Sequence, residues 1–178
     1  MDNNCGCVHI YSGDGKGKTT AAVGLAARMA GHGKSVLFCQ LLKGVPSGEL
    51  AALEALGVRV WRPEFDGMEK FVFQMSDSEK ARAAHAYTQC FEAACREVAD
   101  GAIHLLVLDE ILDAVALDMV SPAALLAFLQ NRPQSLEVIC TGRRPDEGLC
   151  ALADYHTDFR AVKHPYDKGL AARPGIEY

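Results

Sequence analysis

The sequence has 178 residues, the usual length of one domain, and we predict a single domain spanning residues 1–178. Its 49% hydrophobic and 23% charged residues are typical of a globular protein and exclude disorder. The net charge of −5 argues against nucleic acid as a partner, because nucleic-acid binders usually carry a basic surface. No apolar run reaches the roughly 18 residues of a membrane span, and the first four residues are polar rather than signal-like. We therefore expect a cytoplasmic protein that does not bind a membrane.

The cysteines support that expectation. There are seven of them, an odd number, and most lie scattered within apolar runs. Such a pattern favours reduced thiols in a core over a framework of disulfides. Cys5 and Cys7 are too close together for a zinc site without a second pair of ligands.

Short apolar runs alternate with helical patterns along the chain. The runs that predict strands are Val8–Tyr11, Ser35–Leu42, Val58–Trp61, Ile103–Leu108, Glu137–Thr141 and Arg160–Val162. The segments that predict helices are Thr19–Ala30, Glu49–Leu56, Asp77–Val98 and Pro122–Leu129. Ser76 and Glu79 have the spacing of a capping box, and Ser121 precedes a proline at the first helical position. This alternation predicts an α/β fold with a mostly parallel sheet of about six strands.

A glycine-rich loop lies between the first predicted strand and the first predicted helix. Compared with the phosphate-loop pattern G-x-x-x-x-G-K-[ST], Ser12 replaces the first glycine and the other positions match. In such a loop backbone amides point at phosphate oxygens, the lysine reaches a phosphate, and the following hydroxyl is placed to bind Mg²⁺. The residues expected to bind ATP here are Gly13, Asp14, Gly15, Lys16, Gly17, Lys18, Thr19 and Thr20.

A second motif supports nucleotide binding. The apolar run from Leu105 ends in two carboxylates, Asp109 and Glu110, which is typical of a Walker B strand. Because the carboxyl ends of parallel strands share one edge with the phosphate loop, we expect these carboxylates opposite Thr19. They are candidate Mg²⁺ ligands with Thr19, and the pattern leaves open which of the two binds the metal.

The two motifs together predict a P-loop NTPase-like (RecA-like) fold with three layers, α/β/α. Short tails flank the predicted domain at residues 1–6 and 168–178. Neither motif says which reaction uses the ATP.

Taken over the whole chain, the motifs resemble those of the P-loop type of ATP:corrinoid adenosyltransferase. The matching motifs are Gly13–Ala22, Gly24–Arg28, Gly31–Lys34, Val107–Glu110, Asn131–Pro133, Thr141–Arg143, Val162–His164 and Gly175–Tyr178. They cover nearly the whole chain from about Val8.

The resemblance implies an activity. Members of this family transfer the 5′-deoxyadenosyl group of ATP to the Co(I) of a reduced corrinoid and release triphosphate, in the synthesis or salvage of adenosylcobalamin. The corrinoid implied here is cob(I)alamin or a cobyrinic acid-type corrinoid such as cob(I)yrinic acid a,c-diamide. ATP is expected to lie reversed in the loop, with C5′ facing the corrinoid. The resemblance implies catalytic roles for Lys18 and Glu110, metal binding by Thr19 with Glu110, and nucleotide contacts for Arg28 and Arg143. It also implies an electron-donating flavoprotein reductase as a partner and a homodimer.

Phe71 and Phe73 fall where the family carries an aromatic pair that displaces the lower ligand of the corrinoid. The second aromatic is often tryptophan in the family, and Phe73 departs from that. Two other functions are compatible with the phosphate loop alone. One is a small-molecule kinase, which would release ADP, and the other is a RecA-like regulatory module that binds ATP and a protein partner.

Overall fold

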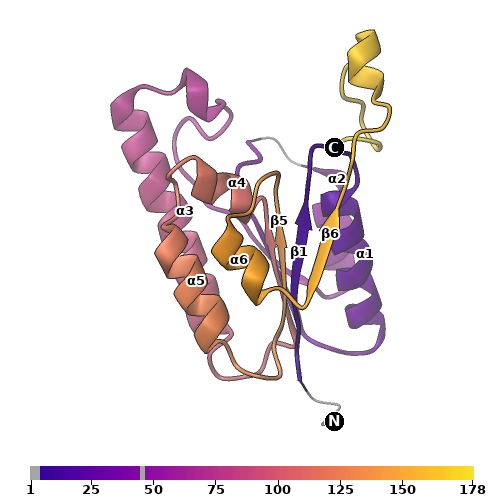
Figure 1. The fold of residues 1–178 in the computed structure, drawn as a ribbon, viewed down its shortest axis with the longest axis vertical. Helices are drawn as coiled ribbons and strands as arrows, with labels where there is room; N and C mark the ends of the chain where they lie inside the picture. Colours follow the sequence, from indigo (N-terminus) through magenta and orange to yellow (C-terminus); the bar gives the residue numbers. More distant parts are fainter. Residues whose placement is uncertain (1–4, 45–46) are drawn as a thin grey trace.

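The computed structural model describes residues 5–44 and 47–178, so residues 1–4 of the predicted N-terminal tail lie outside the described residues. Its centre is a six-stranded sheet in the order β3-β2-β4-β5-β1-β6, in which every neighbouring pair is parallel (Figure 1). The strands are β1 (Val8–Ser12), β2 (Val36–Gln40), β3 (Arg59–Trp61), β4 (Leu105–Asp109), β5 (Glu137–Thr141) and β6 (Tyr155–Asp158). The α/β fold and the sheet of about six strands are confirmed.

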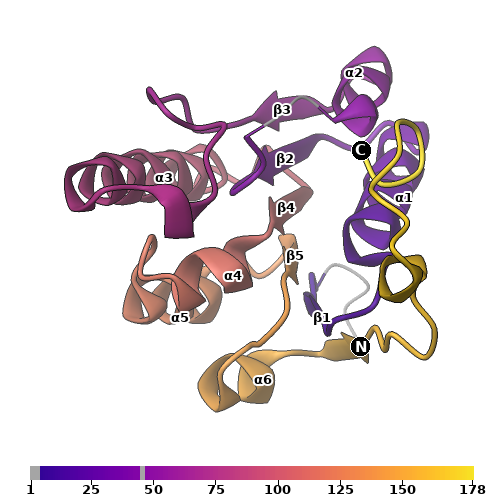
Figure 2. The ribbon, with the colours of Figure 1, turned by 90° about the horizontal axis from the view of Figure 1, so that it is seen from above.

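Helices cover both faces of this sheet. They are α1 (Lys18–Gly31), α2 (Gly48–Ala55), α3 (Asp77–Glu97), α4 (Ile111–Ala116), α5 (Pro122–Asn131) and α6 (Glu147–Leu152), with 3₁₀ turns η1 (Val72–Gln74) and η2 (Pro165–Lys168). Figure 2 shows α1 and α2 on one face and α3 to α6 on the other, which gives the predicted three layers. No helix within the described residues is long and apolar enough to cross a membrane.

The alternation of side chains along β4 builds a separate core on each face. Leu106 and Leu108 pack under α3 to α6, whereas Leu105 and Val107 pack under α1 and α2. All four side chains are buried, because a central parallel strand is covered on both faces. The apolar runs of the sequence reflect this double burial.

Capping residues set the starts of the longer helices. The Ser76 hydroxyl accepts the amide of Glu79 at α3, and the Ser121 hydroxyl accepts the amide of Ala124 at α5. Both starts were predicted from these serines. The caps matter because the first turn of a helix has no intrahelical acceptors for its amides.

The strand predicted at Arg160–Val162 is wrong. The sixth strand is β6, five residues earlier, and it pairs with β1 at the edge of the sheet. All four of its residues are exposed, so they carry no apolar run that could reveal the strand. The prediction also lacked α4 and α6, which have six residues each and are too short to show a helical period.

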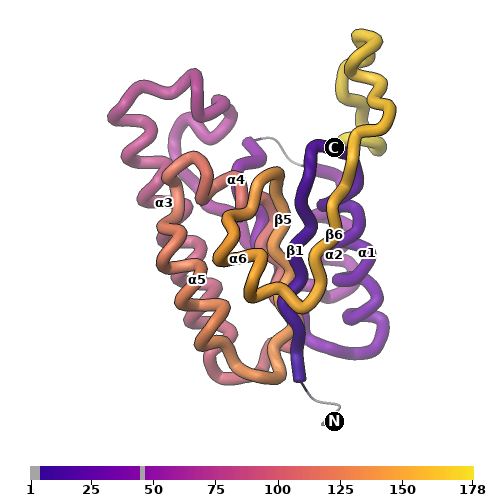
Figure 3. Tube along the Cα trace, viewed as in Figure 1, coloured from indigo at the N-terminus to yellow at the C-terminus, as the bar shows by residue number. Residues whose placement is uncertain are grey.

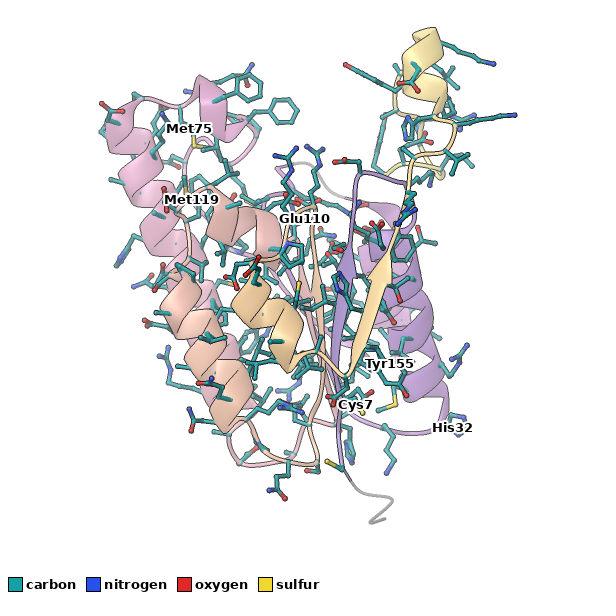
Figure 4. The ribbon with its side chains drawn as sticks, viewed as in Figure 1. Cys7, His32, Met75, Glu110, Met119 and Tyr155 are labelled. Carbon is teal, nitrogen blue, oxygen red and sulfur yellow. The ribbon has the colours of Figure 1, made fainter. Side chains whose placement is uncertain are left out.

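The amino edge of the sheet, opposite the phosphate loop, carries a partly buried polar contact near Cys7 and Tyr155 (Figure 4). One oxygen of Glu137 accepts the Cys7 amide at 2.9 Å and the other lies 2.5 Å from Nε2 of His9. Burial by itself raises the pKa of Glu137, but the hydrogen bonds from His9 and the Cys7 amide outweigh it and hold the pKa below its usual range.

We expect Glu137→Gln to lower the free energy of unfolding at pH 7. A carboxyl whose pKa is depressed in the folded state stabilises the fold above its unfolded pKa of about 4.3 and loses that contribution as the pH falls through the folded value. The gap between wild type and variant should therefore narrow below about pH 4. Urea denaturation between pH 3 and 7 measures it, and a gap that stays constant would contradict this role of Glu137.

Candidate functional site

The phosphate loop connects β1 to α1 at the carboxyl edge of the sheet. Gly13 and Gly17 have φ angles of 108° and 119°, a left-handed conformation that glycine adopts at little cost. The Gly13 amide donates to the carbonyl of Arg143 at 3.1 Å, and the Gly15 amide donates to the carbonyl of Phe159 at 2.6 Å. Two distant segments, after β5 and after β6, thus hold the loop in shape.

No side chain caps the N-terminus of α1, which begins at Lys18 directly after the loop. The first amides of a helix lack intrahelical acceptors, and the helix dipole adds positive potential there. Together they form an anion site at the centre of the loop. Asp14, Lys16 and Thr20 are exposed around it.

Lys18 folds back across this loop. Its Nζ donates to the carbonyls of Gly13 at 2.6 Å and Gly15 at 2.9 Å. Burial lowers the pKa of the Lys18 amine more than any neighbour does, and the charge of Arg143 lowers it further. Lys18 and Arg143 therefore place two positive groups beside the anion site.

Asp109, at the end of β4, is fully buried and its carboxylate is surrounded by donors. Oδ1 accepts the hydroxyls of Thr19 at 2.9 Å and Thr141 at 2.8 Å. Oδ2 accepts Nε2 of Gln40 at 3.3 Å and lies 3.6 Å from Nζ of Lys43. With both oxygens engaged, Asp109 is placed to orient Thr19 rather than to bind a ligand itself.

Glu110 differs from Asp109 in its backbone conformation and in the contacts of its carboxylate. Its φ angle of 63° is left-handed, and its amide donates to the Thr141 hydroxyl at 2.8 Å. Among the described residues, no hydrogen bond reaches its carboxylate. Burial, followed by the charge of Asp109, raises the pKa of Glu110 to about 7. Glu110 lies at the carboxyl edge of the sheet (Figure 4), and its partly buried carboxylate on a strained backbone, without a donor, is poised to accept a cation.

Hydrogen bonds bring the phosphate loop, Asp109 and Arg143 together, with Glu110 next to Asp109. Arg28 and the Phe71–Phe73 pair are placed differently. Arg28 lies ten residues into α1, about 15 Å along the helix axis from the loop, where its charge acts on Tyr11. Phe71 and Phe73 stack with their centroids 5.4 Å apart at the turn η1, which precedes α3. Figure 1 shows this end of α3 at the same edge of the sheet as the start of α1.

Several site residues were not predicted from the sequence. Lys43 donates to Glu49 Oε1 at 3.0 Å, and Gln40 donates to the same oxygen at 3.2 Å. Burial opposes the charge of Lys43, but Asp109 and Glu49 outweigh it and raise the pKa of the amine. Gln40 and Thr141 each end a buried strand with a polar side chain, and that position was the signal that could have revealed them.

We expect Gly15→Ala to weaken ATP binding by about tenfold, because overpacking of this size costs roughly 1–3 kcal/mol. A Cβ at Gly15 would lie 2.6 Å from the carbonyl oxygen of Phe159, so the loop must move. Gly24→Ala is the matched control, since nothing lies within 4 Å of its Cβ position on α1. The control should bind ATP like wild type and unfold at a higher temperature. Titration calorimetry with Mg-ATP compares the three proteins. Equal affinities would show that the contact between Gly15 and Phe159 does not shape the loop for ATP.

The chain has the fold and the site of a P-loop nucleotide-binding protein. A glycine loop joins a strand to a helix, and a buried Walker B aspartate accepts the hydroxyl of the residue after the loop lysine. The family described as ATP:corrinoid adenosyltransferase BtuR/CobO/CobP matches residues 4–178. The chain belongs to this family.

Individual relatives agree with the family match. The chain is 38% identical to the corrinoid adenosyltransferase of Escherichia coli K12 over 175 residues, covering 97% of this chain and 86% of the relative. It has the same identity and coverage with the corrinoid adenosyltransferase CobA of Salmonella typhimurium LT2. With the corrinoid adenosyltransferase of Pseudomonas aeruginosa it is 33% identical, over 97% of this chain and 84% of the relative.

Proposed function

We propose that this chain is a corrinoid adenosyltransferase that moves the 5′-deoxyadenosyl group of ATP to the cobalt of a reduced corrinoid. The observation that carries the proposal is the family match over residues 4–178, because a phosphate loop alone fits kinases equally well. In the reaction the electron pair of Co(I) forms a bond to C5′. The C5′–O bond breaks, and its electrons leave with triphosphate.

The geometry of the site suits that chemistry. Co(I) is itself the nucleophile, so the protein need not activate one. What remains is to hold C5′ beside the cobalt and to stabilise the negative charge that grows on the leaving triphosphate. The loop amides, Lys18 and Arg143 offer positive groups for that charge around one anion site. Asp14, Lys16 and Thr20 border the same site and complete the proposed set of ATP contacts.

A divalent metal fits the oxygens of this site. The Thr19 hydroxyl and the Glu110 carboxylate are hard oxygen donors of the kind that Mg²⁺ prefers. When bound, Mg²⁺ would add positive charge next to the triphosphate. We propose Thr19 and Glu110 as its protein ligands, while Asp109 keeps the Thr19 hydroxyl in place from behind.

The corrinoid and partner assignments are finer parts of the same proposal. Phe71 and Phe73 present two parallel rings to solvent, a surface suited to a large flat ligand. We assign them to the corrinoid. An electron-donating flavoprotein reductase and a homodimer complete the proposal, with residues 1–178 as one domain. We also propose a nucleotide contact for Arg28, which requires ATP to extend along α1.

The test is an anaerobic reaction of the protein with cob(I)alamin and Mg-ATP. The corrinoid spectrum follows the loss of Co(I), and chromatography identifies the phosphate product. Loss of the Co(I) band with an equimolar amount of triphosphate is the expected result. An unchanged spectrum with ADP as product would instead establish a kinase. ATP binding without any product would favour a regulatory module.

A further inference from the structure

The stacked aromatic pair lies on a short segment that the rest of the chain holds in an exposed position. We name residues 70–76 the aromatic loop. Phe71 and Phe73 are 67% and 81% exposed, and their ring planes are 7° from parallel. Burial does not hold side chains at this exposure in place, and fixing them costs conformational entropy. Only contacts of the surrounding loop can therefore restrict the two rings.

Part of that cause is the turn η1 between the two rings. The Gln74 amide donates to the Phe71 carbonyl at 2.8 Å, and the Phe71 amide donates to the Gln74 side chain at 3.1 Å. Val72 and Met75 pack against the core under α3. Figure 4 shows Met75 at the top of this helix, on the same edge as Glu110. The turn is thus anchored on one side and presents its rings on the other.

The remaining cause is one carboxylate, Glu79, in the first turn of α3. Its Oε2 accepts both the amide and the hydroxyl of Ser76 at 2.8 Å. Its Oε1 accepts Nζ of Lys70 at 2.5 Å. Glu79 therefore binds both ends of the aromatic loop at once. We call its contacts with Lys70 and Ser76 the Glu79 clamp.

Glu79 stays ionised under every ordinary condition. The hydrogen bond from Lys70, followed by those from Ser76, lowers its pKa to about 2. An exposed ion pair alone contributes little to stability. Here, however, the ion pair fixes the Lys70 end of a loop whose Ser76 end is already fixed by the helix cap. The pair therefore restricts the motion of the loop more than it stabilises the fold.

We propose that Glu79, through Lys70 and Ser76, is a positioning residue that pre-orders the Phe71–Phe73 pair for the corrinoid. The inference rests on the proposed function, in which these rings meet the corrinoid. A ligand that binds an ordered pair does not pay the cost of ordering it, which is roughly 0.5–1.5 kcal/mol for each side chain. Loss of the clamp should therefore raise the KM for the corrinoid and leave the KM for ATP unchanged.

The main variant is Lys70→Ala, because Lys70 lies outside α3 and its loss keeps the Ser76 cap intact. Glu79→Ala removes both contacts, and Lys70→Arg is the conservative variant that can restore the ion pair. Lys80→Ala is the matched control, since it also removes one positive charge, here from α3, and leaves the contacts of Glu79 with Lys70 and Ser76 intact.

Two readouts are needed. Hydrogen exchange of the ligand-free proteins reports the order of peptides that cover residues 70–76. Steady-state assays with varied cob(I)alamin and varied Mg-ATP separate the two KM values. We expect faster exchange in the loop and an increase of about tenfold in the corrinoid KM for Lys70→Ala and Glu79→Ala. Lys70→Arg and Lys80→Ala should match wild type in both.

Either of two results overturns the inference. One is wild-type exchange in the aromatic loop of Lys70→Ala and Glu79→Ala. The other is faster exchange without a change in the corrinoid KM. In both cases wild-type enzyme still adenosylates the corrinoid and the proposed function stands. A wild-type protein that leaves the corrinoid unchanged overturns the proposed function instead, and the inference falls with it.

Discussion

Lys18→Ala should lower kcat/KM for ATP by about 10²–10³-fold, the range observed when one group that stabilises transition-state charge is removed. Lys18 is half-buried in the loop, and its amine bridges two loop carbonyls. The reaction places negative charge on a leaving triphosphate, and a fixed ammonium in a partly dry site stabilises that charge better than water does. Alanine leaves the space to water.

The measurement is triphosphate release under anaerobic conditions, together with calorimetry of Mg-ATP binding. Lys34→Ala removes the same charge from an exposed position after α1 and should behave like wild type. Denaturation curves of both variants should stay close to wild type, because Lys18 forms no part of either hydrophobic core. Unchanged ATP affinity and unchanged turnover in Lys18→Ala would show that the triphosphate does not lie in this loop.

The central strands and the phosphate loop could be predicted because their signals are local. Strand β4 is four apolar residues followed by an aspartate, and burial on both faces leaves no polar side chain among those four to interrupt the pattern. The loop motif is contiguous, and its meaning depends only on the strand before it and the helix after it. The serine caps of α3 and α5 are equally local, since each acts on an amide three residues away.

The contacts that complete the site could not be predicted, because they join segments far apart in the chain. Phe159 touches Gly15 across 144 residues, and Lys43 approaches Asp109 across 66. Both contacts depend on the order of strands in the sheet, which a single sequence does not state. Strand β6 escaped prediction for another reason, since an exposed edge strand needs no apolar side chains.

The segment after β6 shows the same dependence on distant contacts. From Phe159 the chain rises beside the phosphate loop and then returns toward it, as the tube in Figure 3 shows. The Lys16 amine donates to the carbonyl of Ile176 at 2.7 Å, so the predicted C-terminal tail ends next to the loop. The sequence indicated a tail at residues 168–178 but carried no signal for this approach.

Asp109 and Glu110 are adjacent carboxylates, and the structure predicts opposite results for their amide variants. Glu110→Gln should unfold at the same or a higher denaturant concentration than wild type. Burial and the charge of Asp109 raise the pKa of Glu110 to about 7, so its negative charge is unfavourable in the folded protein without a cation. Its loss should instead raise the Mg²⁺ concentration needed for half-maximal activity by tenfold or more, because even the loss of a residue that only supports a metal ligand costs about 10–100-fold.

Asp109→Asn should have the reverse effect. The buried carboxylate compensates Lys43 and accepts the hydroxyls of Thr19 and Thr141, so its neutralisation breaks a buried charge contact. We expect a loss of about 3 kcal/mol in the free energy of unfolding. Turnover should fall as well, because the Thr19 hydroxyl loses the group that orients it.

The two variants are compared by urea denaturation and by activity as a function of Mg²⁺ concentration. Glu54→Gln, an exposed acid on α2 outside the site, is the control for a lost charge and should match wild type in both measurements. If Asp109→Asn kept wild-type stability and raised the Mg²⁺ requirement, Asp109 would be the metal ligand. Asp109 would then bind the metal and Glu110 would not, despite the four donors that surround Asp109.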